Sequence, residues 1–271
     1  MAQHSLCDIL YRMSVFFFDL DGTLWDEHCR IPESTKYALD ALHQAGHLLF
    51  ICSGRTKGFL NVPGLGSLPF DGGVYGCGTH VQYQNRDLLC TALLPEQTRR
   101  IVDCCSTYGV LPILEGPEYM YVHHALLGYD EVKRNVSQYR EPVQPVMQDA
   151  AAMNVQKATC IHTPDGGTER FNRELSAEFT VISRSGLSEI IPAPYSKASG
   201  MQLILDVLNI DRSDSYAFGD SENDLSMLGH AGHGIAMGGS PAAVHSAAEF
   251  VTDSVKNDGI RNAVTRLGFI H

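Results

Sequence analysis

The stretch VFFFDLDGTLW, residues 15–25, decides the fold of this 271-residue chain. It begins as a continuous apolar run, which is typical of a parallel strand that is covered on both faces. The run ends in two carboxylates, Asp19 and Asp21, with Gly22 and Thr23 directly behind them. In an open parallel sheet, ligands bind beyond the carboxyl ends of the strands. The stretch therefore predicts an α/β sheet and a functional site at its edge.

Strands and helices alternate on both sides of a central section, and strand–helix–strand units with right-handed crossovers build a parallel sheet. Apolar runs predict further strands, and helical periodicity with suitable start and stop residues predicts the helices between them. The predicted strands are 48–54, 72–77, 215–220, 233–238 and 249–254, and the predicted helices are 31–47, 196–210, 222–232, 240–248 and 258–268.

The central section, residues 83–187, has a different pattern, with one clear helix and a series of short strands. Such a series indicates an α+β unit with an antiparallel sheet. We therefore predict a Rossmann-like α/β core made of residues 1–82 and 188–271, with residues 83–187 inserted as a second domain. Residues 1–12 precede the first strand and are expected to be an extension of little structural weight.

Composition excludes several classes of function. The net charge of −11 disfavours general binding to nucleic acid, because an acidic surface repels polyanions. No apolar stretch approaches the roughly 20 residues that span a bilayer, and the first residues do not resemble a signal peptide. The eight cysteines form no CxxC pair. Reduced thiols and a cytoplasmic location are therefore expected.

Further polar residues stand at the ends of predicted strands or at the starts of helices. Ser53 ends the second strand and Lys197 opens a helix. Asp220 ends a later strand and is followed by Asn223 and Asp224. The geometry of a parallel sheet would bring these side chains to the edge where Asp19 and Asp21 lie.

Together these residue types suit phosphoryl chemistry. Clustered carboxylates repel one another unless a cation neutralises them, and all-oxygen ligation suits Mg²⁺ better than zinc. A lysine, a serine hydroxyl and the backbone amides around Gly54 can donate to a phosphoryl group. Asp19 could attack phosphorus as a nucleophile. Asp21 could protonate the leaving oxygen and then deprotonate the attacking water.

Four short motifs in this order resemble the signature motifs of the haloacid dehalogenase superfamily. They are DLDGT at 19–23, the serine of FICSGR at 50–55, SK at 196–197 and GDSENDLSM at 219–227. The position of the insert, between the serine and lysine motifs, and VTDSVKNDGI at 251–260 resemble the Cof-type branch. The resemblance implies a large α+β cap domain that roofs the active site.

The resemblance also implies individual roles. An aspartate two residues after the nucleophile is similar to the phosphatases of the superfamily and unlike its dehalogenases. The implied roles are Asp19 as nucleophile, Asp21 as general acid/base, Ser53, Gly54, Lys197 and Asn223 as phosphoryl-binding residues, and Asp19, Asp21 (through its carbonyl), Asp220 and Asp224 around Mg²⁺, with Asp224 supporting the metal shell.

The sequence therefore predicts a Mg²⁺-dependent phosphatase that hydrolyses a small phosphorylated metabolite, such as a sugar phosphate or a similar phosphomonoester, through an aspartyl phosphate. A phosphosugar mutase is the alternative, and a non-catalytic metabolite-binding module is a third hypothesis. Cys77 and Gly239 stand where Cof-type members often have asparagine, so substrate contacts are not carried over from them. Arg55 is left open between lining the mouth of the site and pairing with a carboxylate.

Overall fold

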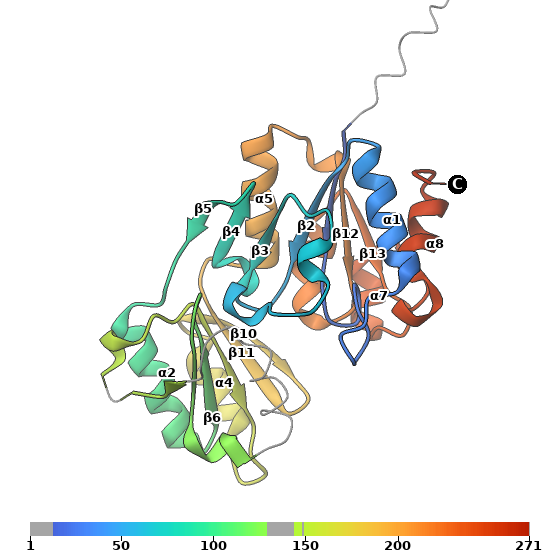
Figure 1. Cartoon of the computed structure of the whole chain (residues 1–271). Coiled ribbons are helices and arrows are strands. Elements are labelled where there is room, and N and C mark those ends of the chain that lie inside the picture. Colours follow the sequence, from blue (N-terminus) through green and yellow to red (C-terminus); the bar gives the residue numbers. More distant parts are fainter. Residues whose placement is uncertain (1–12, 129–143, 148, 271) are drawn as a thin grey trace, which may run out of the picture.

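The chain forms two sheets, one in each of two units (Figure 1). The computed structural model describes residues 13–128, 144–147 and 149–270. The first unit, which we call the core, has an eight-stranded sheet of order β14-β13-β12-β1-β2-β3-β4-β5. The second unit, which we call the cap, has a six-stranded sheet of order β10-β11-β9-β6-β7-β8. The predicted fold class, an α/β core with an inserted α+β unit, is confirmed.

The core sheet is parallel from β14 to β3, and β1 lies between β12 and β2. The hairpin of β4 and β5, which the sequence patterns did not predict, adds two antiparallel strands at the edge next to β3. The strands are β1 (Val15–Phe18), β2 (Leu48–Cys52), β3 (Gly72–Tyr75), β4 (His80–Tyr83), β5 (Arg86–Cys90), β12 (Ser215–Gly219), β13 (His233–Ala236) and β14 (Phe250–Val251).

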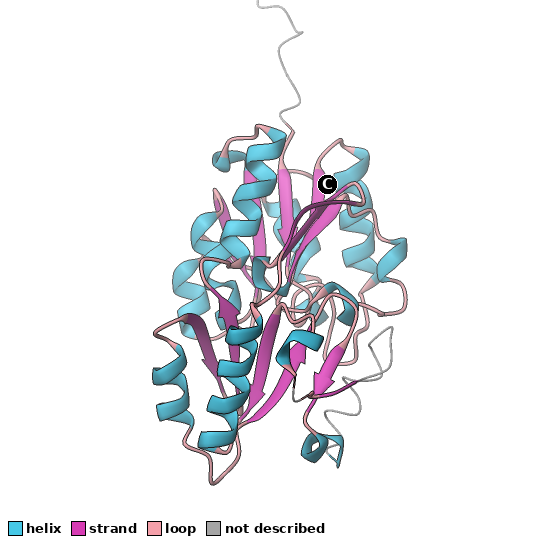
Figure 2. Ribbon diagram, turned by 90° about the vertical axis from the view of Figure 1, so that its left-hand side faces the viewer, coloured by secondary structure: helices cyan, strands magenta, loops and turns pink. Residues whose placement is uncertain are grey.

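Helices cover both faces of this sheet (Figure 2). Phe16 and Phe18 point into a hydrophobic core with α1 (Glu33–Gln44) and α8 (Gly259–Arg266). Phe17 points to the opposite face. There it packs in a second hydrophobic core with α5 (Lys197–Leu208), α6 (Leu225–His230) and α7 (Ala242–Ala247). Burial on both faces explains why β1 is apolar at every position.

In the cap sheet every strand pair is antiparallel except β7 with β8. Two helices, α2 (Pro95–Tyr108) and α4 (Thr168–Leu175), pack on one face of it through a shared hydrophobic core. The helix α4, a charged segment, was not predicted. The strands are β6 (Leu111–Glu115), β7 (Met120–Val122), β8 (Gln144–Pro145), β9 (Lys157–Ile161), β10 (Phe179–Arg184) and β11 (Leu187–Pro192).

Short 3₁₀ helices lie in the connections. They are Lys57–Phe59, Leu65–Ser67, Gly76–Gly78, His124–Gly128, Ala150–Ala152, Arg212–Asp214, Glu222–Asp224 and Val255–Asn257. Within the described residues, no helix is both long enough and apolar enough to cross a membrane. The seven cysteines of this part of the chain are free thiols.

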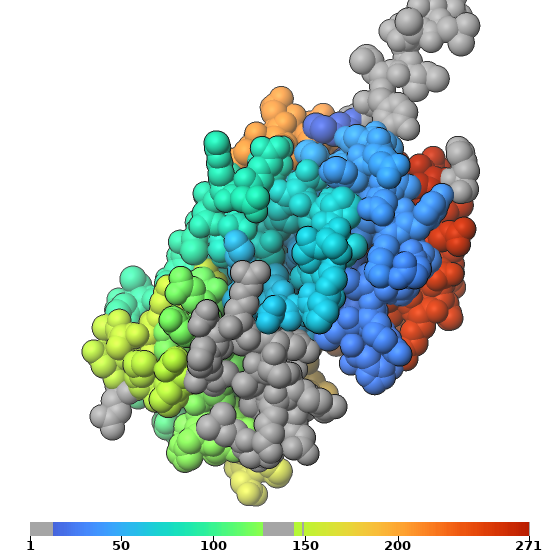
Figure 3. Space-filling view, viewed as in Figure 1, coloured from blue at the N-terminus to red at the C-terminus, as the bar shows by residue number. Residues whose placement is uncertain are grey.

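The chain passes from one sheet to the other slightly later than the predicted domain boundaries. The core sheet continues through β5 to Cys90, and the cap sheet includes β11 up to Pro192. The boundaries at 82/83 and 187/188 remain a prediction. In the space-filling view, the green and yellow cap packs against the blue and cyan part of the core (Figure 3). The prediction for residues 1–12 lies outside the described residues.

Candidate active site

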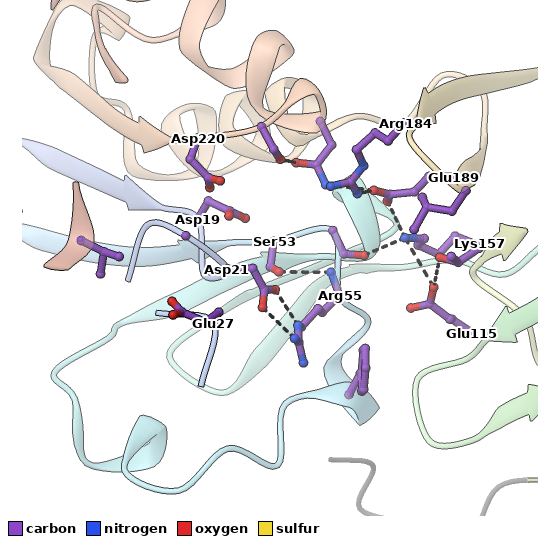
Figure 4. A pocket seen from close by; sticks show the side chains of 18 of the residues that line it. Asp19, Asp21, Glu27, Ser53, Arg55, Glu115, Lys157, Arg184, Glu189 and Asp220 are labelled. Atoms are coloured by element: carbon purple, nitrogen blue, oxygen red, sulfur yellow. Dashed lines mark hydrogen bonds and ion pairs between the residues drawn. The ribbon is translucent and has the colours of Figure 1, made fainter. Parts of the chain in front are cut away.

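A cavity of about 520 Å³ lies at the carboxyl ends of the core strands, under the cap sheet (Figure 4). Both units line it. The core contributes Asp19, Asp21, Gly22, Asp26, Glu27, Ser53, Gly54, Arg55, Phe59, Asp220, Ser221, Asn223 and Val255, and the cap contributes Glu115, Lys157, Thr159, Arg184, Leu187 and Glu189. The cavity thus brings together the predicted site residues from three separate sequence motifs.

Asp19 follows β1 and is held by a buried lysine. Lys197 Nζ donates to Asp19 Oδ1 at 2.6 Å and to Asp224 Oδ1 at 2.5 Å. Lys197 itself lies behind the cavity wall, and it is the first residue of α5, where Ser196 caps the helix by accepting from the backbone N–H of Ser199. Burial alone would lower the pKa of Lys197, but the two carboxylates raise it well above its usual range, so the ammonium stays charged.

Asp224 shapes the loop that carries Asp220. Its Oδ2 accepts from the backbone N–H groups of Asp220 at 2.8 Å and Ser221 at 2.9 Å. Because its Oδ1 already faces Lys197, both oxygens of this fully buried carboxylate have donors. Asp220 Oδ1 accepts from Thr23 Oγ1 at 3.0 Å. Asp224 therefore holds Lys197 and the loop of Asp220 in place, and its support of a metal shell stays a prediction.

The carboxylates form a candidate site for a divalent cation. Asp19, Asp220 and Asp224 each offer an oxygen, and these atoms lie within 4.8 Å of one another. Burial, followed by the charge of Asp224, raises the pKa of Asp220 to about 7, and burial with the same neighbour raises the pKa of Asp19 well above its usual range. The negative charge of these three carboxylates thus exceeds the single positive charge of Lys197. An all-oxygen donor set with excess negative charge fits Mg²⁺.

The open ligand positions belong to Asp19 and Asp220, whose Oδ2 atoms accept no hydrogen bond from the described residues. Gly22 makes room for one of them: a Cβ at this position would lie 2.4 Å from Asp220 Oδ2. The backbone φ of Gly22 is +80°, which also favours glycine. The part of the Asp21 carbonyl as a metal ligand remains a prediction.

Asp21 pairs with Arg55, which also lines the cavity, so both of the roles left open for this arginine occur. Arg55 Nε donates to Asp21 Oδ2 and Nη2 donates to Oδ1, each at 2.7 Å. Trp25 Nε1 donates to the same Oδ1 at 3.0 Å. Burial would raise the pKa of Asp21, but the charge and hydrogen bonds of Arg55, together with Trp25, lower it. The guanidinium also lies over the Phe59 ring, 4.4 Å from its centroid.

Of the predicted phosphoryl-binding residues, Ser53 and Gly54 lie at the end of β2 and Asn223 lies in the loop after β12, whereas Lys197 begins α5 and does not line the cavity. Ser53 Oγ accepts from the backbone N–H of Arg55 at 3.1 Å, which leaves its hydroxyl hydrogen for another acceptor. A Cβ on Gly54 would lie 2.8 Å from Asn223 Nδ2, so a larger residue here would have to displace the Asn223 side-chain amide. Asn223 Oδ1 accepts from Ser221 Oγ at 3.0 Å.

Sequence reasoning missed the cap residues of the site. Lys157 Nζ donates to Glu189 Oε2 at 2.6 Å and lies 3.5 Å from Glu115 Oε1, which accepts from Thr159 Oγ1 at 2.6 Å. Arg184 forms an ion pair with Glu189. A signal was present, because each of these mostly apolar strands carries a single charged residue: Glu115 in β6, Lys157 in β9 and Glu189 in β11.

Cys77 and Gly239, which stand where Cof-type members often have asparagine, have different structural environments. Cys77 is buried, and its Sγ lies 3.6 Å from Glu189 Oε2, as a donor to that oxygen. Gly239 has a φ of +92°, and a Cβ there would meet nothing within 4 Å.

Known proteins similar to this chain include several phosphatases. The family model for haloacid dehalogenase-like hydrolases matches residues 16–264. The 5-amino-6-(5-phospho-D-ribitylamino)uracil phosphatase YitU of Bacillus subtilis (strain 168) is 29% identical over 263 residues, which cover 89% of this chain and 93% of YitU.

Two solved structures cover 95% of this chain and 100% of their own chains. The HAD subclass IIB sugar phosphatase BT4131 has a TM-score of 0.83 and 28% identity. A structure from a study of a trigonal-bipyramidal intermediate in a phosphoryl-transfer superfamily has a TM-score of 0.83 and 26% identity.

Proposed function

Because this chain belongs to the haloacid dehalogenase-like hydrolases, in their capped Cof-type branch, we propose that it is a Mg²⁺-dependent phosphatase acting on a small phosphomonoester. One observation carries the proposal. The carboxylate of Asp19 lies on the cavity floor against Lys197, with Asp220 close enough to share a cation and with Asp21 beside it. The residues expected to act as nucleophile (Asp19), acid/base (Asp21) and metal ligand (Asp220) thus line one cavity.

The first half of the reaction transfers the phosphoryl group to the protein. An oxygen of Asp19 bonds to phosphorus while the bond between phosphorus and the ester oxygen breaks. Asp21 gives its proton to that leaving oxygen, and an alcohol departs. Ser53, Gly54 and Asn223 line the cavity, and their hydroxyl, backbone N–H and side-chain amide would donate to the phosphoryl oxygens. Lys197 orients Asp19 throughout.

The second half releases phosphate. Asp21, now a carboxylate, takes a proton from water as the water oxygen bonds to phosphorus, and the Asp19 carboxylate leaves. Mg²⁺, which Asp19 and Asp220 would hold with the Asp21 carbonyl, would screen the repulsion between carboxylate and phosphate. Inorganic phosphate and an alcohol are the products.

The cavity supports a small, polar leaving group. Its cap side is lined mainly by charged and hydroxyl side chains, and its apolar wall is limited to Phe59, Leu187 and Val255. Among the cap residues, Glu115, Thr159 and Arg184 carry hydrogen-bonding groups that suit a leaving group with several hydroxyls. YitU and the sugar phosphatase BT4131 are named for substrates of this kind. We therefore propose a sugar phosphate or a similar polyol phosphate as the substrate.

The test is phosphate release from a panel of sugar, polyol, nucleotide and aryl phosphates, with Mg²⁺ or with EDTA. Asp19→Asn should lower the rate by at least ~10³-fold, because it removes the nucleophile. Asp206→Asn, an exposed carboxylate on α5, is the matched control and should match the wild type. Isomerisation that requires a bisphosphate would identify a mutase, and Mg²⁺ binding without any turnover would favour a binding module.

A further inference from the structure

We propose that Lys157 and Glu189 of the cap are positioning residues, which lock the phosphoryl-binding residues of the core into their working geometry. The inference rests on the proposed function and adds to it. Both side chains come from the middle of the cap sheet, and both reach across to the core (Figure 4). They contact two of the three core segments that are expected to bind the phosphoryl group.

Glu189 fixes the carboxamide of Asn223. Asn223 Nδ2 donates to Glu189 Oε1 at 3.1 Å, while Asn223 Oδ1 accepts from Ser221 Oγ. The side-chain amide is therefore held at both ends, and its orientation is set by a carboxylate from the other unit. Nδ2 carries a second hydrogen, which remains for a phosphoryl oxygen in the cavity that Asn223 lines.

Lys157 fixes the peptide plane that follows Gly54. Its Nζ donates to the Gly54 carbonyl oxygen at 3.1 Å. Because a peptide unit is planar, holding this carbonyl also holds the N–H of Arg55, which donates to Ser53 Oγ. A single cap lysine thereby steadies the hydroxyl of Ser53 and the backbone of Arg55, whose side chain holds Asp21.

The pair joins these two contacts into one unit. Lys157 and Glu189 are both buried, 3% and 2% exposed, and bond to each other. Arg184 also pairs with Glu189, and Glu115 lies near Lys157, so neither charge is left uncompensated. Buried ion pairs contribute little net stability compared with apolar residues of similar size. Stabilisation of the cap therefore does not explain why buried charged residues occupy these two positions. Alignment of the core loops explains both Lys157 and Glu189.

The consequence is a link between cap closure and chemistry. Gly54 and Asn223 are aligned from the cap side only when the cap lies on the core, as it does in this structure. The aligned atoms face the phosphoryl group, which all phosphomonoesters share. Loss of Lys157 or Glu189 should therefore slow every substrate by a similar factor, whatever its leaving group.

The experiment compares Lys157→Met and Glu189→Leu with the wild type on a sugar phosphate and on p-nitrophenyl phosphate. We expect kcat/KM to fall about 10- to 100-fold on both substrates, because misplacement of about 1 Å costs rates of this size. Glu189→Gln keeps an acceptor for Asn223 but turns an amide NH₂ towards Lys157, so it should recover only part of the loss. Glu174→Gln is the control in the cap: it alters the pair with Arg100 and leaves the Glu189 and Lys157 contacts intact, so activity should be unchanged.

Binding of orthovanadate in the presence of Mg²⁺, measured by calorimetry, separates the outcomes, with circular dichroism confirming that each variant is folded. Weaker vanadate binding in both variants, by a factor similar to the kinetic loss, supports the proposal. A loss confined to one leaving group, or variants equal to the wild type, overturns it. One outcome is a wild type that hydrolyses no ester and yet binds vanadate more tightly than both variants do. In that case the phosphatase proposal fails and the positioning proposal stands. If the wild type binds no vanadate, both fail.

Discussion

At the scale of the residue, the proposed reaction uses Asp21 first as an acid and then as a base, and the environment of Asp21 favours its ionised form. The bidentate Arg55 pair and the Trp25 hydrogen bond stabilise the carboxylate, and they lower its pKa although burial opposes them. The ionised form therefore dominates at neutral pH, which suits the water-activating half of the reaction. For the first half of the proposed reaction Asp21 has to be protonated, and the positive charge of Arg55 disfavours that protonation.

Replacing Arg55 with methionine should move the pH dependence of the first step. Without the guanidinium, the pKa of Asp21 rises, so Asp21 keeps the proton that it gives to the leaving oxygen up to a higher pH. We expect the decline of kcat/KM with increasing pH to occur at higher pH in Arg55→Met. Arg55→Lys keeps the charge and should shift less. Profiles recorded from pH 5 to 9 test this, and an unmoved decline in Arg55→Met would contradict it.

At the scale of the element, the first turn of α5 fixes the position of Lys197. Ser196 and Ser199 form a reciprocal capping box, which fixes the first turn of the helix. Gly78 packs directly on this turn, because a Cβ there would lie 2.1 Å from the Ser196 carbonyl oxygen. This close packing lets a lysine enter a buried position between two carboxylates.

Gly78→Ala should push this turn outward and displace Lys197 from Asp19. The backbone φ of Gly78 is +94°, so the variant also carries the conformational strain of a left-handed alanine, about 1 kcal/mol. Gly46→Ala has the same strain at φ +85° but meets nothing within 4 Å. We expect Gly46→Ala to lose only about 1 kcal/mol of unfolding free energy, and Gly78→Ala to lose clearly more, together with activity. Urea unfolding and phosphate release measure both, and equal effects of the two variants would refute the packing argument.

At the scale of the whole molecule, we expect the acidic cluster of Asp19, Asp220 and Asp224 to make the stability of the fold depend on pH and on divalent cations. Burial and the charge of Asp224 raise the pKa of Asp220 from an ordinary 3.8 to about 7. Over the pH range between these values, Asp220 keeps its proton in the folded state, whereas the unfolded chain has lost it. Between these two pKa values the folded state binds more protons. A rise in pH therefore removes stability that is present at low pH.

In EDTA, the unfolding free energy should consequently fall between about pH 4 and pH 7, with this group contributing at most about 1.4 kcal/mol per pH unit. Asp220→Asn should flatten the fall, and Asp206→Asn should not. Mg²⁺ should restore stability at pH 8 in the wild type, because the proposed site would bind it only in the folded state. Thermal unfolding with and without Mg²⁺ provides the measurement, and a stability of the wild type that is insensitive to both pH and Mg²⁺ would rule out the cluster as the cause.

Much of the core could be predicted from the sequence because its signals are local. An apolar run that ends in Asp19 and Asp21 marks a doubly buried strand, and GDSENDLSM marks a strand end followed by a helix start. The carboxyl ends of parallel strands share one edge of the sheet, and this rule predicted that residues from motifs distant in the sequence lie close together. The hairpin of β4 and β5 and the charged helix α4 escaped prediction, since their patterns give weak periodicity and their partners are distant in the sequence.

The sequence by itself determined the α/β core, the inserted α+β unit and the group of carboxylates, serine and lysine expected at the sheet edge. Only the tertiary structure decided that Arg55 holds Asp21, that Asp224 supports the loop instead of facing the cavity, and that Lys157 and Glu189 reach the core. The physical reason is range. Strand burial and helix caps depend on neighbours along the chain, whereas these contacts depend on how two separately folded sheets lie against each other.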